Sequence, residues 1–467
     1  MKTYQDFLEV KDKSDKERMD FVLSVIKDHQ NSDAYKTAVI ADQYDRQMNT
    51  TIMDFKRALY NLEGKPVEDL WSANYKLASN FFKRFVTQQN QYLLGNGVTW
   101  GKDETKEKLG EDFDTRLQEA GRAALVGGCS YGFWNLNKLV VFKITEYAPL
   151  YDEENGAMRS GVRFWRIDEK KPLRATLYEE DGYTDYIWHG SEGTILNPKR
   201  PYIILTRTTQ IDGTEIYGGE NYPTFPIVPL WGNPHHQSEI LGIRSKIDAY
   251  DIVESGFADD LDSAQIYWIL HNTGGMTDND MRKFIERLHV VHAASVDDEA
   301  GTGVDAHTVD IPHESREKLL DRLKDDLYKE YMAFDVDNIA SGAATATQIR
   351  AAYEPLNSKT DEYEYCVIDF INGILAVAGI DDKPTFTRSK IVNVQEEISV
   401  ITQAAMYLES DYVTQKILTL LGDADKVEDM LLQKDAADSE RLKAAEARLK
   451  DAEDQQKEEQ SGEEGEE

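Results

Sequence analysis

The chain has 467 residues, more than one hydrophobic core usually organises, so we expect two or more packed regions. Hydrophobic residues make up 40% of the sequence and aromatic residues 10%, which excludes a chain that is disordered throughout. The formal net charge of −33 excludes a protein that grips DNA tightly over a wide surface, because such proteins attract phosphates with clustered Lys and Arg. Either the chain has no relation to nucleic acid, which composition favours, or it handles DNA that must slide without sticking.

Membrane insertion and secretion are not expected. The longest apolar run in the C-terminal half, residues 371–380, is far too short to span a bilayer. The first residues lack the apolar stretch of a signal peptide. Cys129 and Cys366 are too few for a disulfide framework, so we expect synthesis in a reducing cytoplasm.

The N-terminal part is predicted to be a helical layer. The first sixty residues have the scattered apolar positions of polar helices. A second helix is predicted over residues 67–94, up to the turn signal Gly95-Asn96-Gly97, and a third over residues 106–125, before Gly127-Gly128.

From Ser130 the pattern changes to short runs of aromatic and β-branched residues. Pairs such as Asp181-Gly182 separate these runs, which predicts an antiparallel meander of hairpins. Four prolines between positions 223 and 234 are expected to close this section. The runs are residues 131–147, 162–167, 175–178, 184–188, 202–206 and 215–217.

Two long amphipathic helices are predicted next, with a compact insert between them. The first covers residues 239–262 and carries apolar residues at steps of three or four, with several Asp residues off that stripe. The insert has strand-like runs at 265–271 and 307–311. The second helix follows Pro312.

The C-terminal part is predicted to be helical. A loop, residues 335–343, leads into a regular helix whose seam requires a partner helix along its length. Pro355 should kink this helix, and Gly379 should end it. The region after position 396 is helical, and the Glu-rich stretch 455–467 is expected to be disordered. The expected fold class is mainly α with a β-rich section, that is, α+β.

No catalytic signature is found. The sequence contains no Gly-Lys-Ser or Gly-Lys-Thr of a phosphate-binding loop, no GxSxG and no HExxH. The glycine-rich stretch 127–132 is interpreted as a turn from a helix to a strand. His289 and His292 lack cysteine partners for a metal site. Carboxylates of the cluster Asp259-Asp260-Leu261-Asp262 should diverge from one another on a helix, which predicts a solvated or lumen-facing surface. We therefore predict no enzyme, no cofactor and no metal site.

The order of these elements, together with local sequence, resembles the portal proteins of tailed double-stranded-DNA bacteriophages. The similarity is greatest to the branch of long-tailed phages of Gram-positive bacteria, and it covers roughly residues 20–420. It is carried by residues 74–84, 92–98, 121–132, 229–239, 247–251, 341–344 and 386–393.

The resemblance implies a division of the chain into the regions of a portal subunit. The wing would be residues 1–237, with a spanning helix at 345–390. The stem would be the two long helices, 238–264 and 313–334, and the clip the insert 265–312. The tunnel loop would be 335–344, the crown 391–454 and an acidic tail 455–467.

The resemblance also implies partners. Such subunits assemble as a ring, normally a dodecamer, at one capsid vertex of the virion, after synthesis in the host bacterial cytoplasm. Double-stranded DNA passes through the ring, and an acidic channel would keep that DNA sliding. The terminase large subunit, a head–tail adaptor, and the major capsid and scaffolding proteins would be partners, and no membrane would be involved.

Three groups of residues follow as site hypotheses. The tunnel loop would contact DNA, the clip would bind partner proteins, and the stem helices would pack between subunits. The residues are Asp335, Asp337, Asn338, Ser341 and Gly342 for the loop, Tyr267, Trp268 and Arg282 for the clip, and Val253, Phe257, Leu323 and Leu327 for the stem. The alternatives are a non-viral helical scaffolding protein and a nucleic-acid enzyme that uses the acidic cluster.

Overall fold

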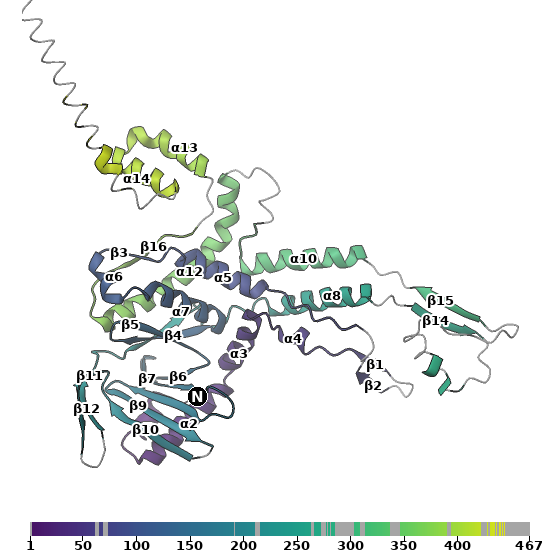
Figure 1. Ribbon diagram of the computed structural model, residues 1–467, viewed down its shortest axis with the longest axis horizontal. Helices are drawn as coiled ribbons and strands as arrows, with labels where there is room; N and C mark the ends of the chain where they lie inside the picture. The colour runs from purple at the N-terminus through teal and green to yellow at the C-terminus, as the bar shows by residue number, and fades with distance from the viewer. Residues whose placement is uncertain are drawn as a thin grey trace, which may run out of the picture. The chain divides into compact units, whose positions relative to one another are not determined.

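A computed structural model describes most of the chain. The described residues are 2–60, 65–68, 73–190, 192–210, 215–262, 266–271, 277, 279–280, 282–284, 303–308, 313–336, 346–389 and 394–421, with scattered positions between 427 and 443. They form two compact units. The first contains residues 1–334 and 354–389, and the second contains residues 335–353 and 390–467. The two units are described separately below (Figure 1).

Four helices open the first unit, as the sequence predicts for its first sixty residues. They are α1 (Tyr4–Leu8), α2 (Asp15–Asn31), α3 (Asp33–Asp45) and α4 (Thr50–Met53). Ser14 and Glu17 form a capping box at the start of α2: the Ser14 side chain accepts from the backbone of Glu17, and the Glu17 side chain accepts from the backbone of Ser14. The Ser32 side chain caps α3 by accepting from the backbone N–H of Tyr35.

Two antiparallel sheets follow, and hairpins form the larger sheet and the β4–β5 pair of the smaller one, as predicted. The larger has the order β10-β9-β8-β7-β6 and the smaller the order β13-β4-β5. A separate hairpin joins β11 (Ile203–Thr209) to β12 (Glu215–Glu220). The strands are β4 (Cys129–Asn135), β5 (Lys138–Lys143), β6 (Tyr147–Tyr151), β7 (Met158–Trp165), β8 (Leu173–Glu179), β9 (Gly182–His189), β10 (Glu192–Arg200) and β13 (Ile227–Trp231).

Strand β13 was not predicted, because its proline at position 229 was interpreted as closing the β section. The strand pairs with β4 alone and so lies at the edge of its sheet. An edge strand tolerates proline, because the missing N–H can fall on the side that has no neighbouring strand.

The larger sheet is buried on both faces. Ala175 and Leu177 of β8 point toward α1 and α2 and join an apolar cluster with Phe21 and Val25. Tyr178 of the same strand points the other way, toward the smaller sheet. This alternation of side chains along a strand produces two separate cores on either side of one sheet.

A third core lies among the helices of the first unit. It contains residues of α5 (Phe81–Leu94), α7 (Phe113–Gly127), α10 (His313–Tyr331) and α12 (Ala346–Ala378). Pro355 lies inside α12, which continues through it. Helix α7 ends at Gly127, Gly128 has a positive φ of 87°, and β4 begins at Cys129. The interpretation of this glycine stretch as a helix-to-strand turn is confirmed.

Two helix predictions were wrong in extent. The helix predicted over 106–125 is two helices, α6 (Asp103–Leu109) and α7, because Gly110 has a φ of 87°, outside the helical region. The helix predicted over 67–94 is helical only from Phe81. Residues 66–68 form strand β2 (Pro66–Glu68), paired with β1 (Ala58–Tyr60), and residues 73–80 are irregular. The functional-site geometry below gives the reason.

The remaining short strands join distant parts of the sequence. β3 (Val98–Trp100) pairs with β16 (Pro384–Phe386). The predicted insert between the long helices contains β14 (Ile266–His271) and β15 (Gly303–Thr308), which pair antiparallel. The second of these strands begins earlier than predicted.

The second unit contains helix α13 (Val394–Ala404), a 3-10 turn (Ala405–Tyr407) and helix α14 (Ser410–Leu421). This agrees with the helical C-terminal region predicted from the sequence. The expected disordered tail, 455–467, lies outside the described residues. None of the described helices is long and apolar enough to cross a membrane.

Candidate functional site: the stem helices and their strap

The two predicted long helices are α8 (Arg244–Asp262) and α10, and they run side by side (Figure 1). Lys246 of α8 lies 3.3 Å from Asp326 and 2.5 Å from Glu330 of α10. At the other end of the pair, the ring of Phe257 contacts that of His313 with centroids 5.6 Å apart. Contacts that join the start of one helix to the end of the other show that the pair is antiparallel.

The four apolar stem residues proposed from the sequence differ in exposure. Val253, Phe257 and Leu323 are half-buried, whereas Leu327 is completely buried in the helical core of its own subunit. A side chain that already packs inside one subunit cannot also contact a neighbouring subunit. Leu327 therefore does not belong among the residues proposed for contacts between subunits.

The prediction of a solvated or lumen-facing acidic cluster was wrong for Asp259 and Asp260, and Asp251, about two turns earlier on α8, is buried as well. Asp251, Asp259 and Asp260 are all less than 10% exposed. A buried carboxylate must find hydrogen-bond donors or a positive partner, because its desolvation is costly. In this protein the donors come from residues 73–80, which we call the strap.

The strap is an extended segment whose backbone amides bind a ladder of side chains on α8. The N–H of Ser79 donates to Asp251 at 2.9 Å, that of Leu77 to Ser255 at 3.0 Å, and that of Tyr75 to Asp259 at 2.7 Å. Residue numbers rise along the strap as they fall along α8, so the two segments are antiparallel.

The ladder forms because the spacing of the acceptor side chains along α8 matches the spacing of the donor amides along the strap. Residues four apart in an α-helix are separated by about 6 Å along its axis and lie close to one face. Alternate residues of an extended chain are separated by about 6.6 Å. Three side chains of one helix can therefore bind three alternate amides of one extended segment. These contacts hold the strap extended, which explains why the predicted helix begins only at Phe81.

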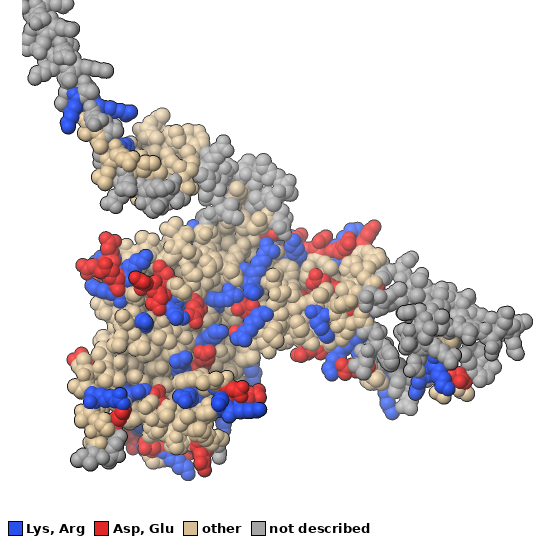
Figure 2. Space-filling model, viewed as in Figure 1, with Lys and Arg blue, Asp and Glu red and all other residues tan. Residues whose placement is uncertain are grey.

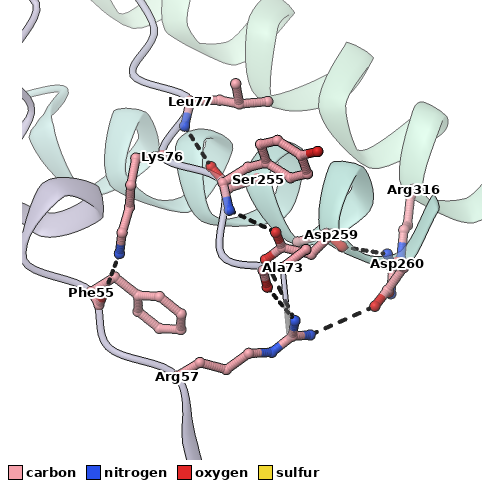
Figure 3. A network of polar contacts seen from close by, with 11 residues as sticks. Phe55, Arg57, Ala73, Lys76, Leu77, Ser255, Asp259, Asp260 and Arg316 are labelled. Atoms are coloured by element: carbon pink, nitrogen blue, oxygen red, sulfur yellow. Dashed lines mark hydrogen bonds and ion pairs between the residues drawn. The ribbon is translucent and has the colours of Figure 1, made fainter. Parts of the chain in front are cut away.

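Two arginines complete the network at the C-terminal end of α8 (Figure 3). Arg57 lies 3.7 Å from Asp259 and 3.8 Å from Asp260, and it donates to the carbonyl of Ala73 at 2.8 Å. Arg316 of α10 lies 2.5 Å from Asp260. The adjacent carboxylates of Asp259 and Asp260 therefore connect α8 with the strap, through Arg57, and with α10, through Arg316.

A second polar contact fixes the other end of the ladder. The Asn49 amide donates to Asp251 at 2.5 Å and to the carbonyl of Ser79 at 3.1 Å. Burial raises the pKa of the Asp251 carboxyl, although its hydrogen bonds to Asn49 and Ser79 oppose the shift. Burial also raises the pKa of the nearby Glu254, and the negative charge of Asp251 adds to that shift.

The acidic cluster does not have the arrangement of a metal-dependent nuclease. The carboxylates of Asp259 and Asp260 are bound by an amide and by guanidinium groups. In the part of the chain that the structure describes, no group of three His, Cys, Asp or Glu residues is arranged to hold a metal ion. His289 and His292 lie outside the described residues.

The other proposed site residues are only partly described. Tyr267 and Trp268 lie in β14 opposite His307 and Ala306 of β15, and Arg282 is exposed. In the proposed tunnel loop, Asp335 is half-buried. The loop residues outside the described part of the chain are Asp337, Asn338, Ser341 and Gly342.

The sequence interpretation missed the strap and its arginines. A signal was present, because Asp251, Ser255 and Asp259 repeat every four residues on the side of α8 away from its apolar stripe. Such a polar ladder indicates a bound partner segment. Nothing in the spacing of Arg57 or Arg316 indicates that they meet at the same carboxylate.

The chain is similar in sequence to phage portal proteins over most of its length. The sequence model of the family described as "Phage portal protein, SPP1 Gp6-like" matches residues 23–458. The chain is 23% identical to a portal protein of Clostridium phage phiCD119 over 73% of this chain and 81% of that protein. It is 25% identical to the portal protein of Bacillus phage SPP1 over 74% of this chain and 73% of that protein.

Among solved structures, the chain is similar to a chain in the neck of an empty gene transfer agent particle. The sequence identity is 12% and the TM-score is 0.38, over 73% of this chain and 90% of the other. The family assignment does not depend on this similarity, because the sequence model alone spans most of the chain. The non-viral scaffolding alternative is thereby set aside, and the chain belongs to the SPP1 Gp6-like family of phage portal proteins.

Proposed function

We propose that this portal subunit forms its ring through the stem pair, α8 and α10, and that double-stranded DNA passes through the centre of that ring. One observation carries the proposal. Val253, Phe257 and Leu323 of the stem remain half-buried in the isolated subunit. Apolar side chains in this state are available for burial against a neighbouring subunit.

The test is the assembly state of the purified protein. Size-exclusion chromatography with light scattering should give a large oligomer, and negative-stain microscopy should show rings with a central hole. Val253→Asp places a charge in the proposed interface and should shift the protein toward monomers. A wild type that remains monomeric at high concentration, under several salt conditions, would contradict the proposal.

We propose a twelve-subunit ring in which the insert with β14 and β15 forms the clip. The clip would bind the terminase large subunit during packaging and a head–tail adaptor later, and capsid and scaffolding proteins would surround the wing. The paired strands β14 and β15 support this view, because among the described residues each pairs with the other alone, which leaves an edge on which a partner can add a strand. Replacing residues 274–298 by a short linker should leave rings intact and block DNA packaging. Normal DNA filling in that variant would rule the clip assignment out.

We also propose that residues 335–344 form the loop closest to the DNA. Ser341 and Gly342 are small, and the carboxylates of Asp335 and Asp337 offer no attraction to phosphates. Asn338→Arg with Ser341→Arg would add two positive charges per subunit to this ring of loops. Those charges should bind phosphates in a salt-dependent way and slow packaging. Packaging at the wild-type rate, with rings intact, would show that the loop does not touch DNA.

A further inference from the structure

The chain passes between the two compact units at three points, which we call the crossings. It leaves the first unit after Phe334, returns to it at Glu354 and leaves it again after Ser389. Side chains of α5 and of the turn that follows it bind the chain beside every one of these crossings. The residues that make these contacts are four apart in sequence: Gln88, Tyr92 and Asn96.

Gln88 holds the first crossing at two points. Its side-chain oxygen accepts from the N–H of Phe334 at 3.0 Å, and its side-chain nitrogen donates to the carbonyl of Phe334 at 2.8 Å. A primary amide that binds both main-chain groups of one residue fixes the orientation of that residue as well as its distance. Just before Phe334, Met332 has a φ of 63° and the N–H of Ala333 donates to the carbonyl of Tyr328, which ends α10 sharply.

Tyr92 holds the second and third crossings. Its hydroxyl donates to the side-chain oxygen of Asn357 at 2.5 Å, about one turn after α12 enters the first unit. Its main-chain carbonyl accepts from the N–H of Ser389 at 3.0 Å. Asn96 adds a contact near the third crossing, because its side chain donates to the carbonyl of Thr387 at 2.9 Å. One residue of α5 therefore binds the chain both where it returns to the first unit and where it leaves it again.

Pro355 makes the second crossing depend on these contacts. A proline has no N–H, so α12 lacks the hydrogen bond that would join residues 351 and 355 across this crossing. The helix by itself therefore holds the crossing less firmly than an unbroken ladder would. The contact between Tyr92 and Asn357 lies directly after this weak point.

Gln88 and Tyr92 fix the two ends of one segment. Residues 335–356 lie between Phe334 and Asn357 and include the loop 335–344 that we propose to lie closest to the DNA. Gln88 and Tyr92 are separated by about 6 Å along the axis of α5 and lie close to one side of it. The segment therefore begins and ends at neighbouring side chains of a single helix.

The surface charge of the first unit makes the placement of such a segment important. On the face that Figure 2 shows, Lys and Arg side chains are interspersed with Asp and Glu side chains. A mixed face of this kind does not attract phosphates over a wide area. Contact with passing DNA then depends on where the chain places individual segments.

We propose that Gln88 and Tyr92 are positioning residues for the passage of DNA. They hold the ends of residues 335–356 and thereby set where the loop within that segment meets the DNA, without touching the DNA themselves. The inference rests on the proposed function of the loop. Because the same contacts also stabilise the fold, the test compares variants that lose similar contacts of α5 at and away from the crossings.

The first experiment removes the contact at the second crossing. Tyr92→Phe deletes only the hydroxyl that donates to Asn357. The matched control is Tyr363→Phe, because the Tyr363 hydroxyl of α12 contacts Asn90 of α5 at 3.0 Å, away from the crossings. Both tyrosines are buried, so the two variants should lower the melting temperature similarly. Only Tyr92→Phe should slow DNA packaging, by about two- to tenfold, the change in a local equilibrium that one lost hydrogen bond produces.

The second experiment removes the contacts at the first crossing. Gln88→Leu deletes both hydrogen bonds to Phe334, and Gln88→Glu keeps an acceptor for the Phe334 N–H but loses the donor. The amide of Phe334 should exchange with deuterium about tenfold faster in Gln88→Leu, with a smaller increase in Gln88→Glu. The matched control is Gln91→Leu, the same change on the same helix, because Gln91 binds Gln118 of α7 and no crossing. Mass photometry should find intact rings for all these variants.

Unchanged exchange at Phe334 in Gln88→Leu would overturn the inference. Equal slowing of packaging by Tyr92→Phe and Tyr363→Phe would also overturn it, because the effect would then follow stability and not position. The Asn338→Arg, Ser341→Arg variant separates this inference from the proposed function. If that variant slows packaging but Tyr92→Phe and Gln88→Leu package at the wild-type rate, the inference fails and the proposed loop contact stands. If that variant packages normally, the proposed loop contact fails, whatever the exchange at Phe334.

Discussion

The space between the two sheets and the junction of the strap with the stem helices are both buried, but different forces hold them. Between the sheets, Phe133, Phe142, Tyr147 and Tyr178 pack with ring centroids 5.2 to 6.0 Å apart. At the strap, carboxylates bind amides and guanidinium groups at 2.5 to 3.8 Å.

The two regions should therefore respond differently to substitution. Apolar packing is not directional, and its contribution scales with the area and volume removed. A buried carboxylate depends on each of its donors, and a donor without an acceptor in the interior is costly. The aromatic region should therefore tolerate changes that preserve volume, whereas the strap junction should tolerate changes that preserve hydrogen bonding.

The largest expected effect is in the aromatic region. Phe142 is completely buried, so Phe142→Ala should lower the free energy of unfolding by about 3–5 kcal/mol. Phe142→Leu preserves most of the volume and should cost less than about 1.5 kcal/mol. Urea denaturation measures both. Equal losses for the two variants would show that the ring makes a specific contact that volume does not describe.

A smaller loss is expected at the strap junction. Asp259→Ala removes the acceptor of the Tyr75 amide and a partner of Arg57, and it should cost about 2–3 kcal/mol, allowing for the partial exposure of Arg57. Asp259→Asn keeps an oxygen for the amide and should cost less. The control is Glu314→Ala, at an exposed ion pair with Lys318 on α10, which should change stability by less than about 0.5 kcal/mol. If Asp259→Ala is as mild as the control, the ladder does not hold the strap.

The pH dependence of Asp251 should give a still smaller effect. Burial raises the pKa of Asp251 above its ordinary value of 3.8, so the folded state binds this proton more tightly than the unfolded state. The stabilisation by that proton is present below the ordinary value and is lost as the pH rises through the folded-state pKa.

The Asp251→Asn variant has no carboxyl group at this position, so it does not lose this stabilisation as the pH rises. Its free energy of unfolding, relative to that of the wild type, should therefore improve from about pH 3 to about pH 7. Urea denaturation across this range measures the difference. Glu254→Gln should change with pH in the same direction, because burial also raises the pKa of Glu254. A difference for Asp251→Asn that does not vary with pH would contradict the shift.

No effect is expected from removal of the acidic tail. Residues 455–467 contain no apolar side chain to bury, so a chain that ends at position 454 should keep the melting temperature and the ring assembly of the full chain. Differential scanning fluorimetry and mass photometry measure the two quantities. A large fall in either would show that the tail packs against the rest of the protein.

Features that depend on local periodicity were predictable from the sequence alone. The apolar steps of α8 and α10, the hairpins marked by Asp181-Gly182, and the turn at Gly128 were all predicted, because each depends on residues that are close together in the chain. The family resemblance depended on the order of these elements and was confirmed by the family match.

Only the tertiary structure decided the features that depend on distant partners. The pattern over residues 67–94 predicted one helix, but the amides of residues 75, 77 and 79 bind α8, about 170 to 185 residues away, and the strap stays extended. Asp259 and Asp260 were predicted to be solvated or lumen-facing, because neighbouring carboxylates diverge from one another on a helix. Their burial depends on Arg57 and Arg316, which meet only in the folded chain. Local propensities amount to a few tenths of a kcal/mol per residue, and charged hydrogen bonds in the interior to several times more, so the distant partners prevail.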